Sequence, residues 1–322
     1  MRKLLLVAAI VTACCSHPAA AADYPNRPIT FVVPFAAGGP TDVLARTMAE
    51  RMSAVLKQSV VVENMPAAGG SVGVGHVVQA APDGYTISVG NWSTHVLNGA
   101  IYSLSYDLVT DLAPVVRLPS SPQLIVARKS LEANTLGELT AWLKSHPANI
   151  GTAGVGSAGH VSALLYQKQN GGQFSYAHYR GAGPAMIDLV GGHIDVMFDQ
   201  SANSLPHVRT GAIKAYAVTS ATRLAPAPNI PTVDEAGLPG FHVAVWHGLW
   251  APKATPADVV AKLNAAAREV MERDPAVREK FAALGQSIPE PDQLAPAALM
   301  EWQKAEIAKW WPVLKAANVK AE

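Results

Sequence analysis

The sequence predicts an α/β protein of two lobes, each a largely parallel β-sheet flanked by helices. Apolar runs of strand length alternate with helical patterns along most of the chain, which is typical of parallel sheets covered on both faces. The alternation restarts near residue 125, so that two units of similar size follow one another. The chain has 322 residues, which is long for one hydrophobic core and ordinary for two.

The N-terminus has the three parts of a secretory signal peptide. Arg2 and Lys3 form a basic start, residues 4–13 are apolar, and the small residues 20–22 form a cleavage site. The apolar stretch is too short to remain as a membrane anchor. We therefore expect export, with cleavage after Ala22 and release. A second interpretation stays open, because residues 11–14 also fit a lipoprotein signal in which Cys14 is lipidated.

Composition excludes several kinds of chemistry. Both cysteines, Cys14 and Cys15, lie in the predicted signal peptide, so the mature chain has no disulfide, cysteine nucleophile or cysteine metal site. The 25 basic and 24 acidic residues give a formal charge of +1, and no block of like charge is present. We therefore expect no nucleic-acid or membrane-surface partner. We also expect no cofactor and a monomeric protein.

Three strand–helix pairs make up the first predicted unit. Their strands are expected at 29–35, 59–65 and 85–90, and the segments after them at 40–56, 69–81 and 91–102 read as helices. We assign residues 24–124 to lobe 1. The chain from about residue 255 is helical to its end, with Pro275, Pro289 and Pro296 at helix starts or breaks, and residues 246–322 complete this lobe.

The second predicted unit, lobe 2, covers residues 125–245. Its first strand is expected at 122–128, and a helix follows at 135–145, where Thr135 and Glu138 form a capping pair. A second helix is expected at 157–169. Further strand-like segments lie at 148–154, 174–180, 193–200 and 212–220.

Glycine-rich turns join a strand to a helix in each lobe. Gly38 and Gly39 precede Pro40 in lobe 1, and residues 154–159 match G-x-G-x-x-G in lobe 2. Such turns expose backbone amides at the positive end of a helix dipole, which suits a carboxylate or phosphate. From the first segment alone, a plain tight turn before Pro40 explains the glycines equally well. A dinucleotide site is a weak interpretation of the second, because the next strand ends in Tyr179 and Arg180 rather than an acid.

Six motifs, in order, resemble the solute-binding proteins of tripartite tricarboxylate transporters, the Bug family. The similarity spans about residues 24–315 and is carried by RPITFVVPFAAGGPTDVLAR, VENMPAAGGSVGVGHVVQAAPDGYTI, DLAPVVRL, HYRGAGPAMIDLVGGHIDVMFD, PTVDEAGLPG and WHGLWAPKATP. The resemblance implies a hinged periplasmic binding protein of type II, the Venus-flytrap architecture. It also implies capture of a small organic mono- or dicarboxylate, aromatic ones included, without catalysis. A permease in the cytoplasmic membrane would then receive the ligand.

The same resemblance suggests which residues hold the ligand. The loops 35–42 and 154–160 match those that hold a carboxylate through backbone amides and bridging waters. Arg180 stands where family members often have lysine, so the identity of the ligand stays open. The candidate ligand-binding residues are Phe35, Ala37, Gly38, Gly39, Thr41, Asp42, Asn91, Trp92, His95, Gly156, Ser157, Ala158, His160, Arg180, Asp199 and His247.

Three other functions compete with that of a transport receptor. Residues 69–73 fit the G-x-S-x-G nucleophile elbow with Ser71, but no acid partner is suggested by spacing, and close packing of a helix start explains the small residues better. The histidines are scattered and form no metal-ligand motif. A receptor that signals to a membrane sensor stays an alternative, because it would use the same liganded form.

Overall fold

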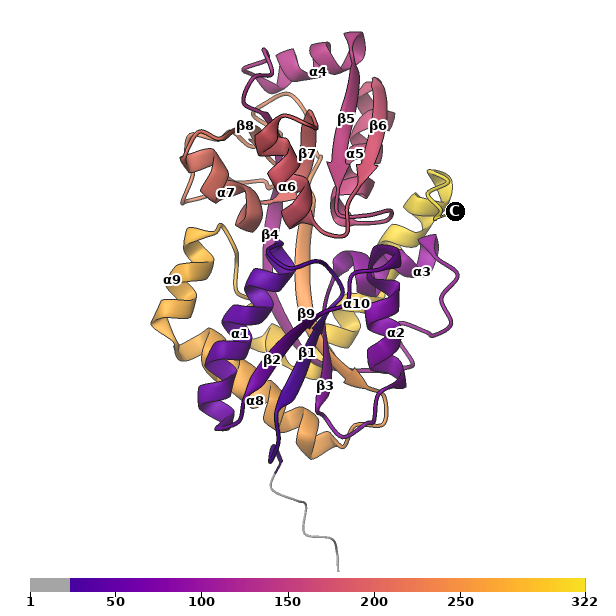
Figure 1. Ribbon diagram of the computed structural model, residues 1–322, viewed down its shortest axis with the longest axis vertical. Coiled ribbons are helices and arrows are strands. Elements are labelled where there is room, and N and C mark those ends of the chain that lie inside the picture. The colour runs from indigo at the N-terminus through magenta and orange to yellow at the C-terminus, as the bar shows by residue number, and fades with distance from the viewer. Residues whose placement is uncertain (1–23, 322) are drawn as a thin grey trace, which may run out of the picture.

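A computed structural model describes residues 24–321, and the predicted signal peptide lies outside the described residues. Within this range, nine strands form a strongly curled sheet in the order β2-β1-β3-β9-β4-β7-β5-β6, with β8 paired to β4 (Figure 1). The strands are β1 (Ile29–Val33), β2 (Val60–Asn64), β3 (Thr86–Asn91), β4 (Leu112–Arg128), β5 (Pro147–Thr152), β6 (Gln173–His178), β7 (Val196–Gln200), β8 (Ile213–Val218) and β9 (Ala244–Pro252).

Helices cover both faces of this sheet. They are α1 (Pro40–Leu56), α2 (Ser71–Gln79), α3 (Asn98–Ile101), α4 (Leu136–Ser145), α5 (Ala158–Asn170), α6 (Ala182–Gly191), α7 (Ser201–Arg209), α8 (Ala257–Arg273), α9 (Pro275–Ala283) and α10 (Pro296–Ala316). Short turns of other helix types are η1 (Ala68–Gly70), η2 (Ser93–Leu97) and η3 (Pro291–Leu294). Between residues 24 and 321, no helix has the length and apolar character needed to cross a membrane.

Two long strands connect the lobes. The first part of β4 pairs with β9 from Leu112 to Pro122, and its last part pairs with β7 and β8 from Gln123 onward. Pairs of β1 with β2 and β3, and of β5 with β6 and β7, are parallel. Every antiparallel pair among the described strands involves β4 or β9. The two strands that connect the lobes therefore account for the antiparallel part of the sheet.

Each lobe has its own helical layers. In the lower lobe of Figure 1, α1 and α8 pack on one face of the sheet through side chains such as Met48 and Leu263, while α2 and α10 cover the other. In the upper lobe, α6 and α7 share a core with Leu124 and Val126 of β4. Helices α4 and α5 cover the opposite face. The described residues thus form a two-lobed α/β protein.

Local signals predicted the helices well and the longest strand poorly. Helix α1 has the predicted bounds, and Thr135 caps α4 by accepting a hydrogen bond from the Glu138 amide at 3.1 Å. The predicted strand 122–128 is only the end of β4. The first half of β4 contains prolines, and its register with β9 shifts between Pro114 and Val116 and again between Leu118 and Ser121. The strand continues because bulges absorb these shifts.

Candidate ligand-binding cavity

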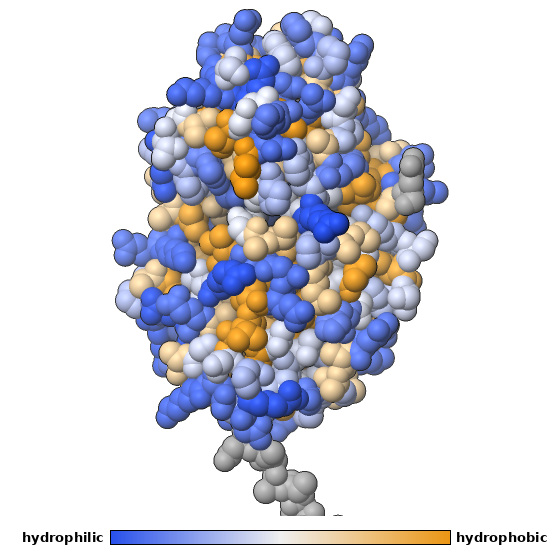
Figure 2. Space-filling view, viewed as in Figure 1, coloured by the Kyte–Doolittle hydropathy of each residue, from blue (hydrophilic) through white to orange (hydrophobic). Residues whose placement is uncertain are grey.

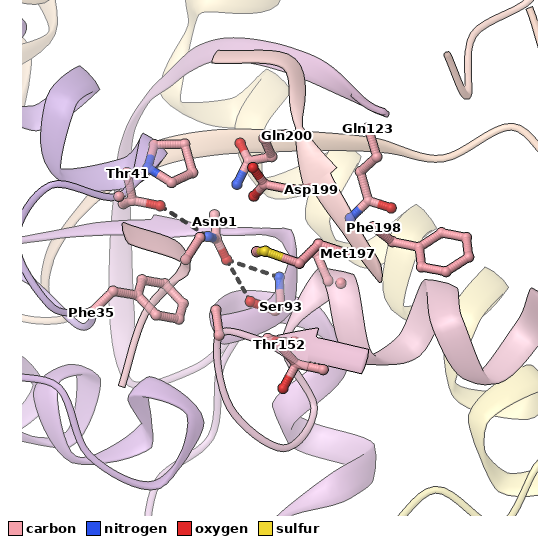
Figure 3. A pocket seen from close by; sticks show the side chains of 18 residues that line it. Phe35, Thr41, Asn91, Ser93, Gln123, Thr152, Met197, Phe198, Asp199 and Gln200 are labelled. Atoms are coloured by element: carbon pink, nitrogen blue, oxygen red, sulfur yellow. Dashed lines mark hydrogen bonds between the residues drawn. The ribbon is translucent and has the colours of Figure 1, made fainter. Parts of the chain in front are cut away.

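A cavity lies between the lobes, where strands of both sheets end. Its empty volume is about 490 Å³, and its walls come from β3, β4, β5 and β7 and from the segments that follow strands β1, β5 and β6. Figure 3 shows Phe35, Thr41 and Asn91 of lobe 1 facing Thr152, Met197 and Asp199 of lobe 2 across this space. No lysine, arginine or histidine is among the described residues that line it.

Four helix N-termini meet at the cavity. The residues at these ends that line it are Gly39, Pro40 and Thr41 for α1, Ser157, Ala158 and Gly159 for α5, Ala182 for α6 and Gln200 for α7. Within the described chain, the caps of α1, α6 and α7 make no side-chain hydrogen bond to their helices. The first amides of a helix have no partner inside it, and the helix dipole is positive there. The helix ends therefore contribute positive potential to the cavity, whose described lining includes the Asp199 carboxyl and no cationic side chain.

The two glycines of the Gly38–Gly39 turn have different structural roles. Gly38 has a φ of +82°, which favours glycine, and its amide donates to Asp42 Oδ2 at 2.9 Å. That amide is not free for a ligand, contrary to the expectation for both glycines. Gly39 has an ordinary φ of −83°, but a Cβ there would lie 3.4 Å from the Gly183 amide nitrogen of the other lobe. A Cβ on Gly39 would thus make an ordinary contact with the other lobe, and only a larger side chain would hinder the approach of the lobes.

Asp42 is directed away from the cavity. Burial alone would raise its pKa, but hydrogen bonds from Arg46, from the Gly38 amide and from Asn64 outweigh burial, so the pKa lies below its usual value. Its charge therefore fixes the turn and is paired with Arg46 at 2.9 Å.

The facing loop of lobe 2 is fixed by its own contacts. Ser157 caps α5 by accepting from the His160 amide at 3.4 Å, and the Gly156 amide donates to His160 Nδ1 at 3.1 Å. A Cβ on Gly159 would lie 2.5 Å from the Phe198 carbonyl oxygen, so only glycine lets α5 approach β7 this closely. This is the packing role of the last glycine in G-x-G-x-x-G.

A buried polar network supports the α1 end of the cavity. His247 Nδ1 lies 3.0 Å from the Pro119 carbonyl oxygen and must donate to it, so Nε2 accepts from Thr41 Oγ1 at 3.2 Å. Asn91 Nδ2 in turn donates to Thr41 Oγ1 at 3.2 Å. Burial lowers the pKa of His247 to about 4, although the Pro119 bond opposes this effect. A neutral His247 therefore orients Thr41 from behind.

Asp199 places a carboxylate in the wall. Its Oδ2 accepts from Ser204 Oγ at 2.6 Å and from Asn203 Nδ2 at 2.8 Å, at the start of α7. Burial raises the pKa of Asp199 to about 6, while these hydrogen bonds oppose the rise.

The structure brings seven of the predicted residues together. Those that line the cavity are Phe35, Gly39, Thr41, Asn91, Ser157, Ala158 and Asp199. The other nine do not line it: Ala37, Gly38, Asp42, Trp92, His95, Gly156, His160, Arg180 and His247. Their direct roles in ligand binding stay predictions, but their positions favour supporting roles.

Several of these nine have clear structural positions. Trp92 packs edge-on against Trp310 at 4.8 Å, and the His95 ring stacks on Trp250 at 3.7 Å. Burial lowers the pKa of His95 to about 3. Ala37 and Gly38 border a separate apolar groove outside the cavity, with Pro184 and Ile187 of α6; Figure 2 shows apolar residues (orange) on both sides of the lobe boundary.

Sequence reasoning missed most of the side chains from the centre of lobe 2. The cavity residues not predicted singly are Pro40, Ser93, Gln123, Gly151, Thr152, Ala153, Gly159, Ala182, Met197, Phe198 and Gln200. Pro40 and Gly159 do fall within the two predicted loops. The polar residues at the ends of strands β5 and β7 carried a usable signal, because ligands bind beyond the carboxyl ends of such strands.

The lobes touch beside the cavity. The Ala36 amide of lobe 1 donates to the Arg180 carbonyl oxygen of lobe 2 at 2.9 Å, and Tyr102 Oη donates to the Val155 carbonyl oxygen at 2.8 Å. Both bonds use backbone atoms of the loops that line or flank the cavity. This arrangement covers the space between the lobes.

Ser71 of the G-x-S-x-G match is engaged structurally. It begins α2, and its hydroxyl donates to the Ala68 carbonyl oxygen at 2.9 Å. A Cβ on Gly70 would lie 2.7 Å from Thr94 Cγ2, so close packing requires this glycine.

Two lobes joined by crossing strands, with a cavity of polar and apolar residues between them, define a solute-binding protein. The comparison with protein families agrees, because residues 44–319 match the model of the tripartite tricarboxylate transporter family receptor, TctC. The chain belongs to this family, whose members are periplasmic solute-binding receptors, as the resemblance to the Bug proteins predicted.

Three similar solved structures share this fold. The periplasmic binding protein BugD is 37% identical with a TM-score of 0.89, covering 92% of this chain and 100% of BugD. MatC from Rhodopseudomonas palustris with bound malate is 39% identical with a TM-score of 0.86, covering 90% and 100%. R. palustris Rpa4515 with adipate is 32% identical with a TM-score of 0.88, covering 92% and 100%.

Proposed function

We propose that this protein captures a small organic carboxylate in the periplasm and delivers it to a tripartite tricarboxylate-type permease in the cytoplasmic membrane. Its similarity to MatC, which holds malate, and to Rpa4515, which holds adipate, supports a carboxylate as the ligand. The family match supports a permease as the partner and a periplasmic location. The protein acts as a receptor and not as an enzyme.

One observation carries this proposal: the N-termini of four helices meet at the cavity. Free amides of α1, α5 and α6 bind a carboxylate as they bind other anions, through charge-assisted hydrogen bonds. Residues 24–124 with 246–322 form one moving lobe, and residues 125–245 form the other. Closure about β4 and β9 buries the ligand, and the bonds from Ala36 and Tyr102 then hold the lobes together.

A thermal-shift screen of aliphatic and aromatic carboxylates on the purified mature protein tests the function. A ligand at one hundred times its Kd should add about 2.7 kcal/mol to the free energy of unfolding. Calorimetry then supplies the Kd. If no carboxylate raises the melting temperature and none gives binding heat, the proposal is wrong.

The export proposal has its own test. Protein recovered from the periplasm should begin near Asp23 and carry no lipid, since cleavage after Ala22 removes both cysteines. Mass spectrometry that finds a diacylglyceryl group on Cys14 would instead establish the lipoprotein form.

A further inference from the structure

Asp199 is the only acidic or basic residue among the described residues that line the cavity. It lies in β7, its side chain belongs to the lining (Figure 3), and the residue is 4% exposed. Ser204, Asn203 and the Gln200 amide donate hydrogen bonds to its carboxyl group. Within residues 24–321, no basic side chain forms a salt bridge with it. The cavity therefore holds a buried carboxyl group that has hydrogen-bond donors but no counter-charge from the described chain.

The basic groups near the cavity supply little positive charge at neutral pH. His178 Nδ1 lies 2.7 Å from Thr152 Oγ1, His160 lies beside His178, and His247 contacts Thr41 from behind. Burial lowers the pKa of all three histidines, so they are mostly neutral at pH 7. Asp199 forms no described salt bridge with the other acidic and basic residues of the elements around it, which are Asp42, Arg46, Glu50 and Arg51 of α1, Arg117 and Arg128 of β4, Lys168 of α5, Arg180 after β6, Asp188 of α6, His207 and Arg209 of α7, Lys214 of β8 and Arg278, Glu279 and Lys280 of α9.

A carboxylate that enters this cavity must lie near Asp199. The empty volume is about 490 Å³, and a sphere of that volume is about 10 Å across, so both charges lie within the distance of roughly 8–10 Å over which salt screens them. Two carboxylates that share a buried site repel, and the pKa of one of them rises. The helix N-termini favour the anion of the ligand. The proton should therefore go to Asp199, whose pKa burial has already raised to about 6.

We propose that Asp199 takes up a proton from the solvent when the protein captures a carboxylate. The solute then binds the helix N-termini as an anion, and the neutral carboxyl group of Asp199 leaves one negative charge fewer in the cavity. This inference rests on the proposed function and adds the proton as a second ligand of the same site. Capture should therefore become tighter as pH falls, within the range in which the solute remains ionised.

Calorimetry in buffers of different ionisation enthalpy counts the protons taken up. Malate, adipate and benzoate are the first probes, measured from pH 7 to 8.5, where their own carboxyl groups are ionised. At pH 7, Asp199 with a pKa of about 6 is mostly ionised in the empty cavity. If the ligand raises that pKa by about one to two units, binding should take up roughly half a proton or more, and affinity should fall about two- to tenfold per pH unit.

Asp199→Asn assigns the proton to this residue. Asparagine stays neutral at every pH, and its carbonyl oxygen still accepts hydrogen bonds from Ser204 and Asn203. Proton uptake should disappear in this variant, and affinity should no longer depend on pH between 7 and 8.5. Asp258→Asn, the same change on an exposed residue, should bind and take up protons like wild type.

A measurement on wild type does not depend on the folding of any variant. Carbon-13 NMR follows the carboxyl group of Asp199, and its titration midpoint should rise by about one to two pH units when the ligand saturates the protein. The same experiment shows whether a histidine titrates instead, because each imidazole has its own signals.

The outcomes separate this inference from the proposed function. Carboxylate binding without proton uptake, or uptake that persists in Asp199→Asn, would overturn the role of Asp199 while leaving carboxylate capture in place. If no carboxylate binds at all, both the function and the proton uptake are refuted.

Discussion

Replacing Gly39 with valine should weaken ligand capture without unfolding the protein. A Cβ at this position would lie 3.4 Å from the Gly183 nitrogen and 3.6 Å from the Ala182 nitrogen, both in the opposite lobe. Such distances are ordinary contacts, so alanine should fit, whereas the γ-methyl groups of valine would overlap the start of α6. Overpacking of this kind costs about 1–3 kcal/mol. The cost falls only on the form in which the lobes touch, so affinity should fall about 5- to 150-fold.

Calorimetry on wild type, Gly39→Ala and Gly39→Val measures this effect, with ligand-free melting temperatures recorded for each. The backbone at Gly39 suits any residue, so all three should melt alike without ligand. Gly38→Ala is a control in which stability should change and affinity should not. The φ of +82° at Gly38 strains alanine, so the free energy of unfolding should fall. No described atom lies within 4 Å of the new Cβ, so ligand affinity should not change. Valine binding as tightly as glycine, or alanine losing as much affinity as valine, would refute this account of the turn.

Three further outcomes are expected. Small-angle scattering should show a smaller radius of gyration with ligand than without, and an unchanged profile at saturating ligand would show that the lobes do not close. Thr41→Val leaves His247 Nε2 and the Asn91 amide unpaired, so urea denaturation should show that the free energy of unfolding falls by about 1–3 kcal/mol. Thr41→Ser keeps the hydroxyl and should largely avoid this loss. Equal losses in both variants would contradict the network. Burial lowers the pKa of His95 to about 3 and those of His160 and His247 to about 4, against an ordinary value near 6.5. The stability that these neutral histidines contribute is therefore present above pH 6.5 and is lost as pH falls toward 4. The pKa of Asp199 is raised to about 6, so protonation of this residue stabilises the folded protein as pH falls from 6 to 4. Asp199→Asn lacks this gain, and its free energy of unfolding should fall more steeply in acid than that of wild type. Parallel plots of the free energy of unfolding against pH would contradict this assignment.

Local chemistry made the strand–helix junctions predictable. The bounds of α1, the Thr135 cap of α4 and the glycine turns at 38–39 and 154–159 all follow from residue types at fixed spacing. These junctions position the amide-rich part of the cavity, so residue types alone were enough to locate that part.

The rest of the cavity depends on contacts between distant segments. Gln123 faces the ligand space because β4 changes its partners from β9 to β7 near this residue, and no local pattern indicates that change. His247, whose direct contact with a ligand stays a prediction, lies behind Thr41, since β9 pairs with both β3 and β4. Polarity at a strand end shows that a residue is near a site, but not which side of the site it occupies.

The division of the cavity into a main-chain part and a side-chain part has a consequence for evolution. Backbone amides persist through almost any substitution, so the proposed grip on a carboxylate would resist mutational loss. The opposite wall depends on individual side chains such as Gln123, Met197 and Asp199, each of which one codon change can alter. A gene duplicate could therefore acquire a new solute in a few steps while it remains a carboxylate receptor throughout. Receptors with this architecture can diversify without passing through a non-binding intermediate.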